Sequence, residues 1–170
     1  MQIVKEIQSK VYKDYFFIKG KVDIDSKYFI EKIKKGCSDK DAINYQTNIL
    51  GGHTSWKYFV EDLKFNKVLF KLLDYLDNNL NLPSYQLTEC WGFQCHLGSK
   101  TRNHNHSPMI VSGVIYLNEH PQILEFTDID QTVKPEKGSF VLFSPFLNHG
   151  CNRNHLDTVK YGISFNMSLS

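Results

Sequence analysis

Residues 110–118 read Ile-Val-Ser-Gly-Val-Ile-Tyr-Leu-Asn, and residues 139–144 read Ser-Phe-Val-Leu-Phe-Ser. Both are short runs of β-branched, aromatic and other apolar residues beside polar turn residues, a pattern that is typical of β-strands. The same pattern predicts further strands at 87–96, 102–106, 123–127, 149–153 and 161–169. Because these strands follow one another with no helical segment between them, they favour a sandwich or jelly roll over a parallel sheet.

The segment before these strands is rich in lysine and has helical periodicity. Ser26 is a suitable N-cap for a helix that runs to about Lys35, and Gly36 is a suitable stop. From about residue 55 to residue 80, apolar residues recur mostly at steps of three and four, which predicts a longer helical segment. Asn66 falls within it, so this segment could form two helices rather than one.

These patterns divide the chain into a helical N-terminal part over residues 1–84 and a β core over residues 85–170. Neither an internal repeat nor a low-complexity linker separates the two parts. We therefore expect residues 1–170 to form a single, mainly β domain, with helices that cover one face of the β core. A chain of 170 residues can bury such a core without disulfides to stabilise it.

The composition excludes several classes of protein. With 41% hydrophobic and 22% charged residues, the chain as a whole is not disordered, collagenous or a coiled coil. Its net charge of +2 is too balanced to indicate nucleic-acid binding. No apolar run is long enough to cross a membrane, and residues 1–10 contain no apolar signal core. We therefore expect a cytoplasmic protein whose scattered cysteines, none in a C-x-x-C pair, stay reduced.

The segment Arg102-Asn103-His104-Asn105-His106 holds the residues best suited to chemistry. On a strand, alternate side chains share a face, so His104 and His106 would point the same way and could close on one metal ion. His149, which follows the apolar strand at 139–144, is the best candidate for a third ligand. Three imidazoles suit iron, copper, nickel or zinc about equally well. The alternative is that the His-x-His pair is solvated surface.

From Glu89 to the C-terminus, the sequence resembles the 2-oxoglutarate- and Fe(II)-dependent oxygenases, and most closely a small prolyl-hydroxylase-like branch that is common in phage and bacterial genomes. The matching motifs are Trp91-Gly92, His104-x-His106, Ser112-Gly113-Val114-Ile115-Tyr116-Leu117, Pro135-x-x-Gly138, Val141-Leu142-Phe143-Ser144-Pro145, His149 and Lys160-Tyr161-Gly162-Ile163-Ser164-Phe165-Asn166. Upstream, Thr54-Ser55-Trp56 also matches, so the resemblance covers roughly residues 50–168. It implies a double-stranded β-helix (jelly roll) with flanking helices, located in the host cytoplasm if a phage encodes the chain.

The resemblance further implies that His104, His106 and His149 hold Fe(II), leaving open positions for 2-oxoglutarate and O₂, with ascorbate as an optional reductant. His106 stands where the family at large usually has Asp or Glu, although the phage-type branch commonly has His there. A neutral imidazole in place of a carboxylate raises the net charge of the metal site by one.

In this family, a cation about ten residues past the distal His, usually Arg, binds the far carboxylate of 2-oxoglutarate. Lys160 matches that position, eleven residues after His149, and offers a point charge instead of a bidentate fork. Arg153 is the alternative anchor. Tyr116 could donate its hydroxyl to the same carboxylate, and Ser164 could add a hydrogen bond. The alternatives are a surface lysine and a plain core tyrosine.

Other polar and aromatic residues have less specific interpretations. We expect at least three of the remaining histidines to be surface or packing residues: His53, His96, His120 and His155. Trp91 and Gln94 are candidates to line the pocket. Cys151 follows His149 by two residues on the same strand face, and we expect it to be a buried, inert thiol.

The sequence thus predicts a 2-oxoglutarate- and Fe(II)-dependent dioxygenase that hydroxylates a protein side chain or a small molecule, a nucleobase included, with no membrane or nucleic-acid partner. One alternative is a three-histidine cupin-type dioxygenase that uses no 2-oxoglutarate. Another is a non-catalytic jelly-roll module, such as a virion or carbohydrate-binding protein. The chain contains no phosphate-binding loop, dinucleotide fingerprint or serine-nucleophile elbow, so nucleotide binding and serine hydrolysis are not supported.

Overall fold

The computed structural model describes residues 14–43 and 48–170 of the chain. The elements are β1 (Phe17–Lys21), α1 (Ser26–Ser38), β2 (Ile49–Leu50), β3 (Gly52–His53), α2 (Leu63–Asn79), β4 (Tyr85–Cys95), β5 (Lys100–His104), β6 (Val111–Tyr116), β7 (Leu124–Phe126), β8 (Gln131–Val133), β9 (Ser139–Phe143), β10 (His149–Cys151) and β11 (Lys160–Leu169). Residues 1–10, which are predicted to lack a signal core, lie outside the described residues.

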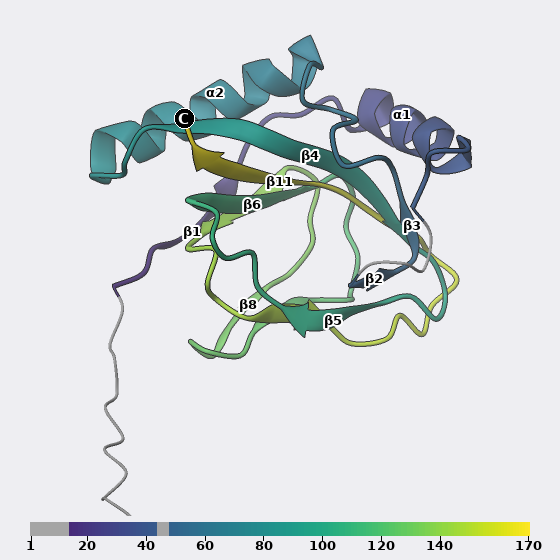
Figure 1. Ribbon diagram of the computed structural model, residues 1–170. Coiled ribbons are helices and arrows are strands. Elements are labelled where there is room, and N and C mark those ends of the chain that lie inside the picture. The colour runs from purple at the N-terminus through teal and green to yellow at the C-terminus, as the bar shows by residue number, and fades with distance from the viewer. Residues whose placement is uncertain (1–13, 44–47) are drawn as a thin grey trace, which may run out of the picture.

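The strands form two antiparallel sheets. The first has six strands in the order β1-β9-β6-β11-β4-β3, and the second has five in the order β2-β5-β10-β7-β8. Figure 1 shows the two sheets as facing layers, with α1 and α2 on the outer side of the six-stranded sheet. Neighbouring strands are mostly distant in sequence, as expected for a jelly roll, and this confirms the predicted double-stranded β-helix with flanking helices.

Strand β6 shows how the sequence builds the two hydrophobic layers. Val111 and Ile115 belong to the cluster that packs under the helices, whereas Val114 and Tyr116 belong to the cluster between the sheets. All six residues of β6 are buried, because this strand is covered on both faces. Gly92 serves the same packing on β4, since a side chain there would overlap Ile33 of α1.

The helices differ in detail from the sequence prediction. Helix α1 starts at Ser26, but Asp25 rather than Ser26 caps it, and it continues past Gly36 to Ser38. The segment from residue 55 begins with turns, and α2 then runs unbroken through Asn66. Helix α2 is thus capped by Asp62, and Asn66 does not divide it into two helices.

The predicted strands of the C-terminal half are all present, with ends shifted by a few residues. The sequence patterns missed β1, β2, β3 and β8, which are two to five residues long. Three of these lie before residue 84, so the N-terminal part is not helical throughout: it adds β1 and β3 to the first sheet and β2 to the second. None of the helices in the described part of the chain is long and apolar enough to span a membrane.

Asp62 joins the two helices, and its removal should destabilise the fold. Its carboxylate caps α2 through the Lys64 and Phe65 amides, and it accepts hydrogen bonds from Tyr28 Oη at 2.9 Å and Lys32 Nζ at 2.6 Å. We expect Asp62→Ala to lower the free energy of unfolding by about 2–3 kcal/mol, measured by urea denaturation. Asp25→Ala, at the exposed cap of α1, is the matched control and should cost less.

The pH dependence of that contribution has a definite sign. Burial raises the pKa of Asp62, but the Lys32 ammonium and the Phe65 amide outweigh it and hold the pKa below 3.8. The stabilisation is therefore complete above pH 3.8 and is lost as the pH falls through the lower folded-state pKa. An equal loss of stability in Asp62→Ala and Asp25→Ala at pH 7 would contradict this account.

Candidate metal centre

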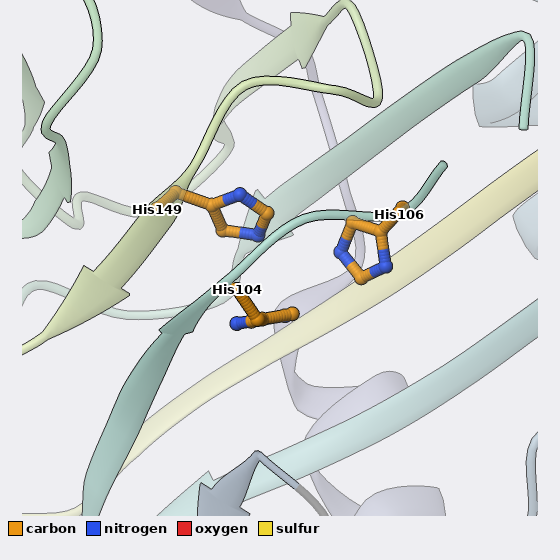
Figure 2. A group of neighbouring side chains, drawn as sticks. All are labelled: His104, His106 and His149. Carbon is orange, nitrogen blue, oxygen red and sulfur yellow. The ribbon is translucent and has the colours of Figure 1, made fainter. Parts of the chain in front are cut away.

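The three histidines of the predicted ligand set meet between the sheets. His104 is the last residue of β5, and His149, the first residue of β10, is its direct partner in the antiparallel register. His106 lies two residues beyond the end of β5, so backbone extension beyond the strand, not strand alternation, brings it to the others. One ring nitrogen from each lies within 4.8 Å of the other two, and Figure 2 shows the three rings turned toward a shared space.

Backbone carbonyls fix the protonation of two of these rings. His104 Nδ1 lies 2.8 Å from the Arg102 carbonyl, and His149 Nδ1 lies 3.0 Å from the Leu147 carbonyl. A carbonyl only accepts, so both Nδ1 atoms carry the proton and both Nε2 atoms are left with a free lone pair. Metal-binding histidines are usually oriented in this way by an acceptor on the outer nitrogen.

His106 has a different outer partner. Its Nδ1 lies 3.5 Å from the side-chain amide nitrogen of Asn166 on β11. The amide of Asn166 is itself held on both sides, because its nitrogen donates to Glu89 at 2.7 Å and its oxygen accepts from Ser112 at 2.7 Å. The third ring thus contacts a partly buried polar network that the sequence analysis did not identify.

Burial keeps the three imidazoles neutral. Desolvation lowers the pKa of His104, and it lowers the pKa of His149 to about 4. The pKa of His106 falls to about 3, first because of burial and then because the other two rings would repel its charge. Neutral imidazole is the form that binds a metal ion, so all three rings are in that form at neutral pH.

The rings face a cavity with about 510 Å³ of empty space, part of it open to solvent. Its walls are largely apolar and aromatic, with contributions from both sheets, and include Trp91, Phe93, Val114, Tyr116, Leu124, Phe143, Cys151, Lys160 and Ser164. Phe126 and Phe143 pack against the His149 ring, with centroids 5.3 and 4.8 Å away. The cavity is therefore a mainly apolar space with a few polar groups, as small-molecule sites generally are.

Lys160 is the cation of this cavity. Its side chain is buried, with 1% of the residue exposed, and it carries no salt bridge to any described carboxylate. Within residues 14–43 and 48–170, the acceptors that its ammonium contacts are neutral: the Gln122 carbonyl and Cys151 Sγ, each at 3.4 Å. A buried charge without a counter-ion is costly, so the arrangement favours an anionic ligand beside Lys160.

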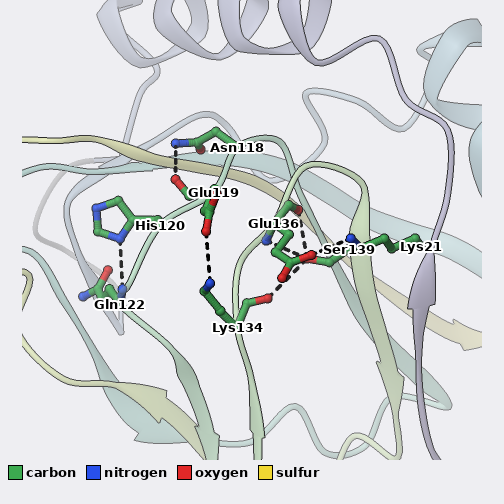
Figure 3. A network of polar contacts seen from close by, with 8 residues as sticks. All are labelled: Lys21, Asn118, Glu119, His120, Gln122, Lys134, Glu136 and Ser139. Carbon is green, nitrogen blue, oxygen red and sulfur yellow. Dashed lines mark hydrogen bonds and ion pairs between the residues drawn. The ribbon is translucent and has the colours of Figure 1, made fainter.

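The wall behind Lys160 is held by a histidine. His120 Nδ1 accepts from the Gln122 amide at 3.1 Å, as Figure 3 shows, and its Nε2 faces the Thr158 carbonyl at 3.1 Å. The Gln122 side chain donates to Ser99 and Asn152 carbonyls. His120 is thus a packing residue, as predicted, and it fixes the loop whose carbonyl meets the lysine.

Of the other residues predicted to bind the co-substrate, two line the cavity and one lies outside it. Tyr116 and Ser164 line the cavity with Lys160, whose ammonium lies 5.9 Å from the Tyr116 ring centroid. Arg153 is exposed, lies outside the cavity lining and donates to the Gly98 carbonyl at 3.2 Å. The alternative anchor is therefore away from the site, because the strand pairing ends two residues before it.

The remaining residues that the sequence analysis singled out differ in their burial and in whether they line the cavity. Trp91 lines the cavity, whereas Gln94 does not. His96 and His155 are exposed, and His53 is fully buried against Trp91 and Trp56. Cys151 is buried, as expected, and lies in contact with Lys160 rather than among the three histidine nitrogens.

These features define an antiparallel double-stranded β-helix with a three-histidine site between its sheets. No protein-family model and no curated protein sequence matches the chain. Solved structures do. The viral collagen prolyl hydroxylase from Paramecium bursaria Chlorella virus-1, in its 2-oxoglutarate complex, is 17% identical, with a TM-score of 0.70 over 93% of this chain and 97% of its own.

Two bacterial structures agree with that match. A Pseudomonas putida prolyl-4-hydroxylase is 14% identical, with a TM-score of 0.68 over 91% of this chain and 92% of its own. HygX from Streptomyces hygroscopicus, with nickel and 2-oxoglutarate bound, is 12% identical, with a TM-score of 0.65 over 91% of this chain and 83% of its own. At such low sequence identities the structural similarity shows a shared fold, and function has to be inferred from the residues of the site.

Proposed function

We propose that the protein is a 2-oxoglutarate- and Fe(II)-dependent oxygenase that hydroxylates its substrate. The observation that carries this proposal is the pairing of two features in one cavity, three neutral imidazoles with converging nitrogens and a buried lysine with no carboxylate partner among the described residues. The first suits a metal ion and the second suits an anion bound beside it. The fold shared with the prolyl hydroxylases and HygX supports the same conclusion.

The donor set fits a ferrous ion. His104, His106 and His149 would bind one side of the metal and leave positions open for co-substrate and O₂. When bound, iron and 2-oxoglutarate supply the oxidation: O₂ is consumed, one oxygen atom leaves in succinate as CO₂ is released, and the other enters a substrate C–H bond. The two outer carbonyls hold His104 and His149 in the ligand tautomer.

Other residues of the cavity would hold the co-substrate. Lys160 would pair with the far carboxylate of 2-oxoglutarate, and Tyr116 and Ser164, which line the same space, would add hydrogen bonds. The apolar walls, with Phe93 and Leu124 among them, would lower the local dielectric constant and so strengthen that charge pair. We propose a protein side chain or a small molecule as the substrate.

Lys160 also separates this proposal from its alternatives. A cupin-type dioxygenase without a 2-oxo acid needs no cation beside its metal, and a non-catalytic module needs neither. The burial of this lysine in the histidine-lined cavity favours the oxygenase that binds a dianionic co-substrate.

The test is an anaerobic titration of the purified protein with Fe(II), with and without 2-oxoglutarate. We expect tight binding of one Fe(II), and a visible charge-transfer band that develops only when 2-oxoglutarate chelates the bound metal. Admission of O₂ should then convert 2-oxoglutarate to succinate. Metal binding without any effect of 2-oxoglutarate would favour the cupin-type alternative, and the absence of metal binding would favour the non-catalytic module.

A further inference from the structure

A second hollow, with about 420 Å³ of empty space that is partly open to solvent, adjoins the metal centre, and Lys160 is not part of its lining. It shares Ile49, Trp91, His104 and His106 with the first cavity and adds Asn48, His53, Trp56, Glu89 and Asn166. A molecule in this hollow would therefore touch two of the three proposed iron ligands. Of the residues that it adds, Asn48, His53 and Trp56 have no proposed part in binding the metal or 2-oxoglutarate, whereas Asn166 contacts His106 and Glu89 holds Asn166.

The register of β4 and β11 gives the two hollows opposite charge. Lys160 pairs with Cys95 at one end of β11, and Asn166 pairs with Glu89 six residues further along. Six residues of extended strand span roughly 20 Å, and alternate residues share a face. The same sheet face thus carries a cation at one end and a carboxylate at the other, and His104 and His149 belong to the second sheet, across the cavity.

Glu89 has no cationic partner among the residues that the structure describes. Its carboxylate accepts one hydrogen bond, from Asn166 Nδ2 at 2.7 Å, and no lysine, arginine or histidine of the described chain forms a salt bridge with it. The residue is half-buried in β4, next to aromatic side chains. A carboxylate in such a place attracts a positively charged group.

His53 adds a second acceptor to this hollow. Its Nδ1 meets the Thr54 carbonyl and therefore carries the proton, which leaves Nε2 with a lone pair. His53 is 0% exposed, and its buried Nε2 has no hydrogen-bond partner in the part of the chain that the structure describes. Burial lowers the pKa of His53 to about 4, so the ring remains a neutral acceptor.

Aromatic rings complete the walls. Trp56 and Trp91 contact each other edge to face, with centroids 4.9 Å apart, and both contact the His53 ring. Trp56 remains 38% exposed at the rim. The faces of tryptophan rings attract ammonium and guanidinium groups. The Trp91 Nε1–H group is also unpaired and would donate to a carbonyl of the bound molecule or to water.

We propose that this hollow binds a cationic group of the substrate, an alkylammonium or a guanidinium such as the side chain of lysine or arginine. Glu89 supplies the counter-charge, His53 Nε2 accepts an N–H bond, and Trp56 and Trp91 cover the alkyl stem. A C–H bond of that stem then lies beside His104 and His106. This last step rests on the proposed oxygenase function, whereas the binding itself does not.

Charge balance permits a cation so near the metal. Fe(II) and the dianion of 2-oxoglutarate sum to zero, and imidazoles that bind a metal ion do so in the neutral form. The positive charge of Lys160 lies at the far end of the sheet face. The carboxylate of Glu89 is therefore the charge that a substrate in this hollow meets first.

The chain offers a direct readout, because Trp56 and Trp91 are its two tryptophans and both line the hollow. The full-length, metal-free protein is titrated with Nα-acetyl-lysine amide, Nα-acetyl-arginine amide and the uncharged Nα-acetyl-norleucine amide, with tryptophan emission as the signal. We expect at least one of the two cations to bind at least tenfold more tightly than the norleucine compound. Equal binding of all three compounds, or none, would overturn the proposal.

Single substitutions test whether the preference for cations arises from the residues of this hollow. Glu89→Gln keeps an acceptor for Asn166 and should remove the preference for cations, whereas Glu119→Gln, at an exposed carboxylate paired with Lys134, should leave it unchanged. Trp56→Leu at the rim, followed by calorimetry, should also weaken cation binding at least fivefold. An unchanged preference in both Glu89→Gln and Trp56→Leu would contradict the assignment. Because no iron or 2-oxoglutarate is present, the outcome is independent of the oxygenase test.

Discussion

His149→Ala is expected to abolish metal binding and, with it, all consumption of 2-oxoglutarate. The three imidazole nitrogens lie within 4.8 Å of one another, so removal of one leaves a two-histidine site with no carboxylate among the described ligand atoms to replace it. Loss of an outer-shell partner alone costs about 10–100-fold in metal affinity, so loss of a ligand should cost at least 100-fold. Co(II) titration, followed by visible absorption, measures the affinity without interference from oxidation.

Controls separate ligand loss from damage to the fold. His149 also packs on Phe126 and Phe143, so His149→Ala leaves a gap in the core. His104→Ala, at the half-buried end of β5, removes a ligand with less packing and should show the same loss of metal. His155→Ala, at an exposed histidine, should bind Co(II) normally. Retention of Co(II) binding by both ligand variants would refute the site.

The strands were predictable because each carries its own local signature. Residues 111–116 and 139–143 are apolar and bounded by turn residues, and they form strands with the expected ends within two residues. The two-residue strands β2 and β3 have no such signature, since pairing with a distant strand is all that makes them strands. Strand β8 is only three residues long and pairs with the preceding strand β7. Propensity over two or three residues contains too little information to reveal that pairing.

The sequence predicted which three histidines lie together, but not the strand pairing that brings them together. The spacing of His104 and His106 suggested a common strand face, yet β5 ends at His104, and it is the pairing of β10 with β5 that brings His149 to them. The roles of Asn166 and Glu89 depend on the register between β4 and β11. A single sequence gives no direct information on register between strands about 75 residues apart.

Lys160 was nominated only through the family resemblance, and its burial is what the structure adds. Nothing in the local sequence distinguishes it from the other lysines of the chain, which are mostly exposed or half-buried where they are described. The loop that meets its ammonium is set by His120 and Gln122, neither of which has a sequence signature. The burial of Lys160 follows from the packing of the two sheets against each other, not from its neighbours in the sequence.

Lys160→Met is expected to weaken 2-oxoglutarate binding strongly and leave metal binding intact. Methionine fills a similar volume but carries no charge, so the far carboxylate of the co-substrate would be buried without a cation to pair with. Removing one member of a buried, hydrogen-bonded charge pair costs about 2–5 kcal/mol, which corresponds to a loss of affinity of roughly 30-fold or more. The measurement is the titration of the Fe(II)-loaded protein with 2-oxoglutarate under anaerobic conditions, followed by the charge-transfer band.

Lys160→Met should weaken 2-oxoglutarate binding but stabilise the fold of the ligand-free protein. Without co-substrate, Lys160 is a buried cation with only neutral contacts, so Lys160→Met should raise the melting temperature of the ligand-free protein. Arg153→Ala is the matched control, because that cation is exposed and bonds the Gly98 carbonyl away from the cavity, and it should change neither property. If Arg153→Ala weakened 2-oxoglutarate binding while Lys160→Met did not, the anchor would be Arg153. A gain in stability together with the loss of 2-oxoglutarate binding would identify Lys160 as a residue kept for its ligand at the expense of the fold.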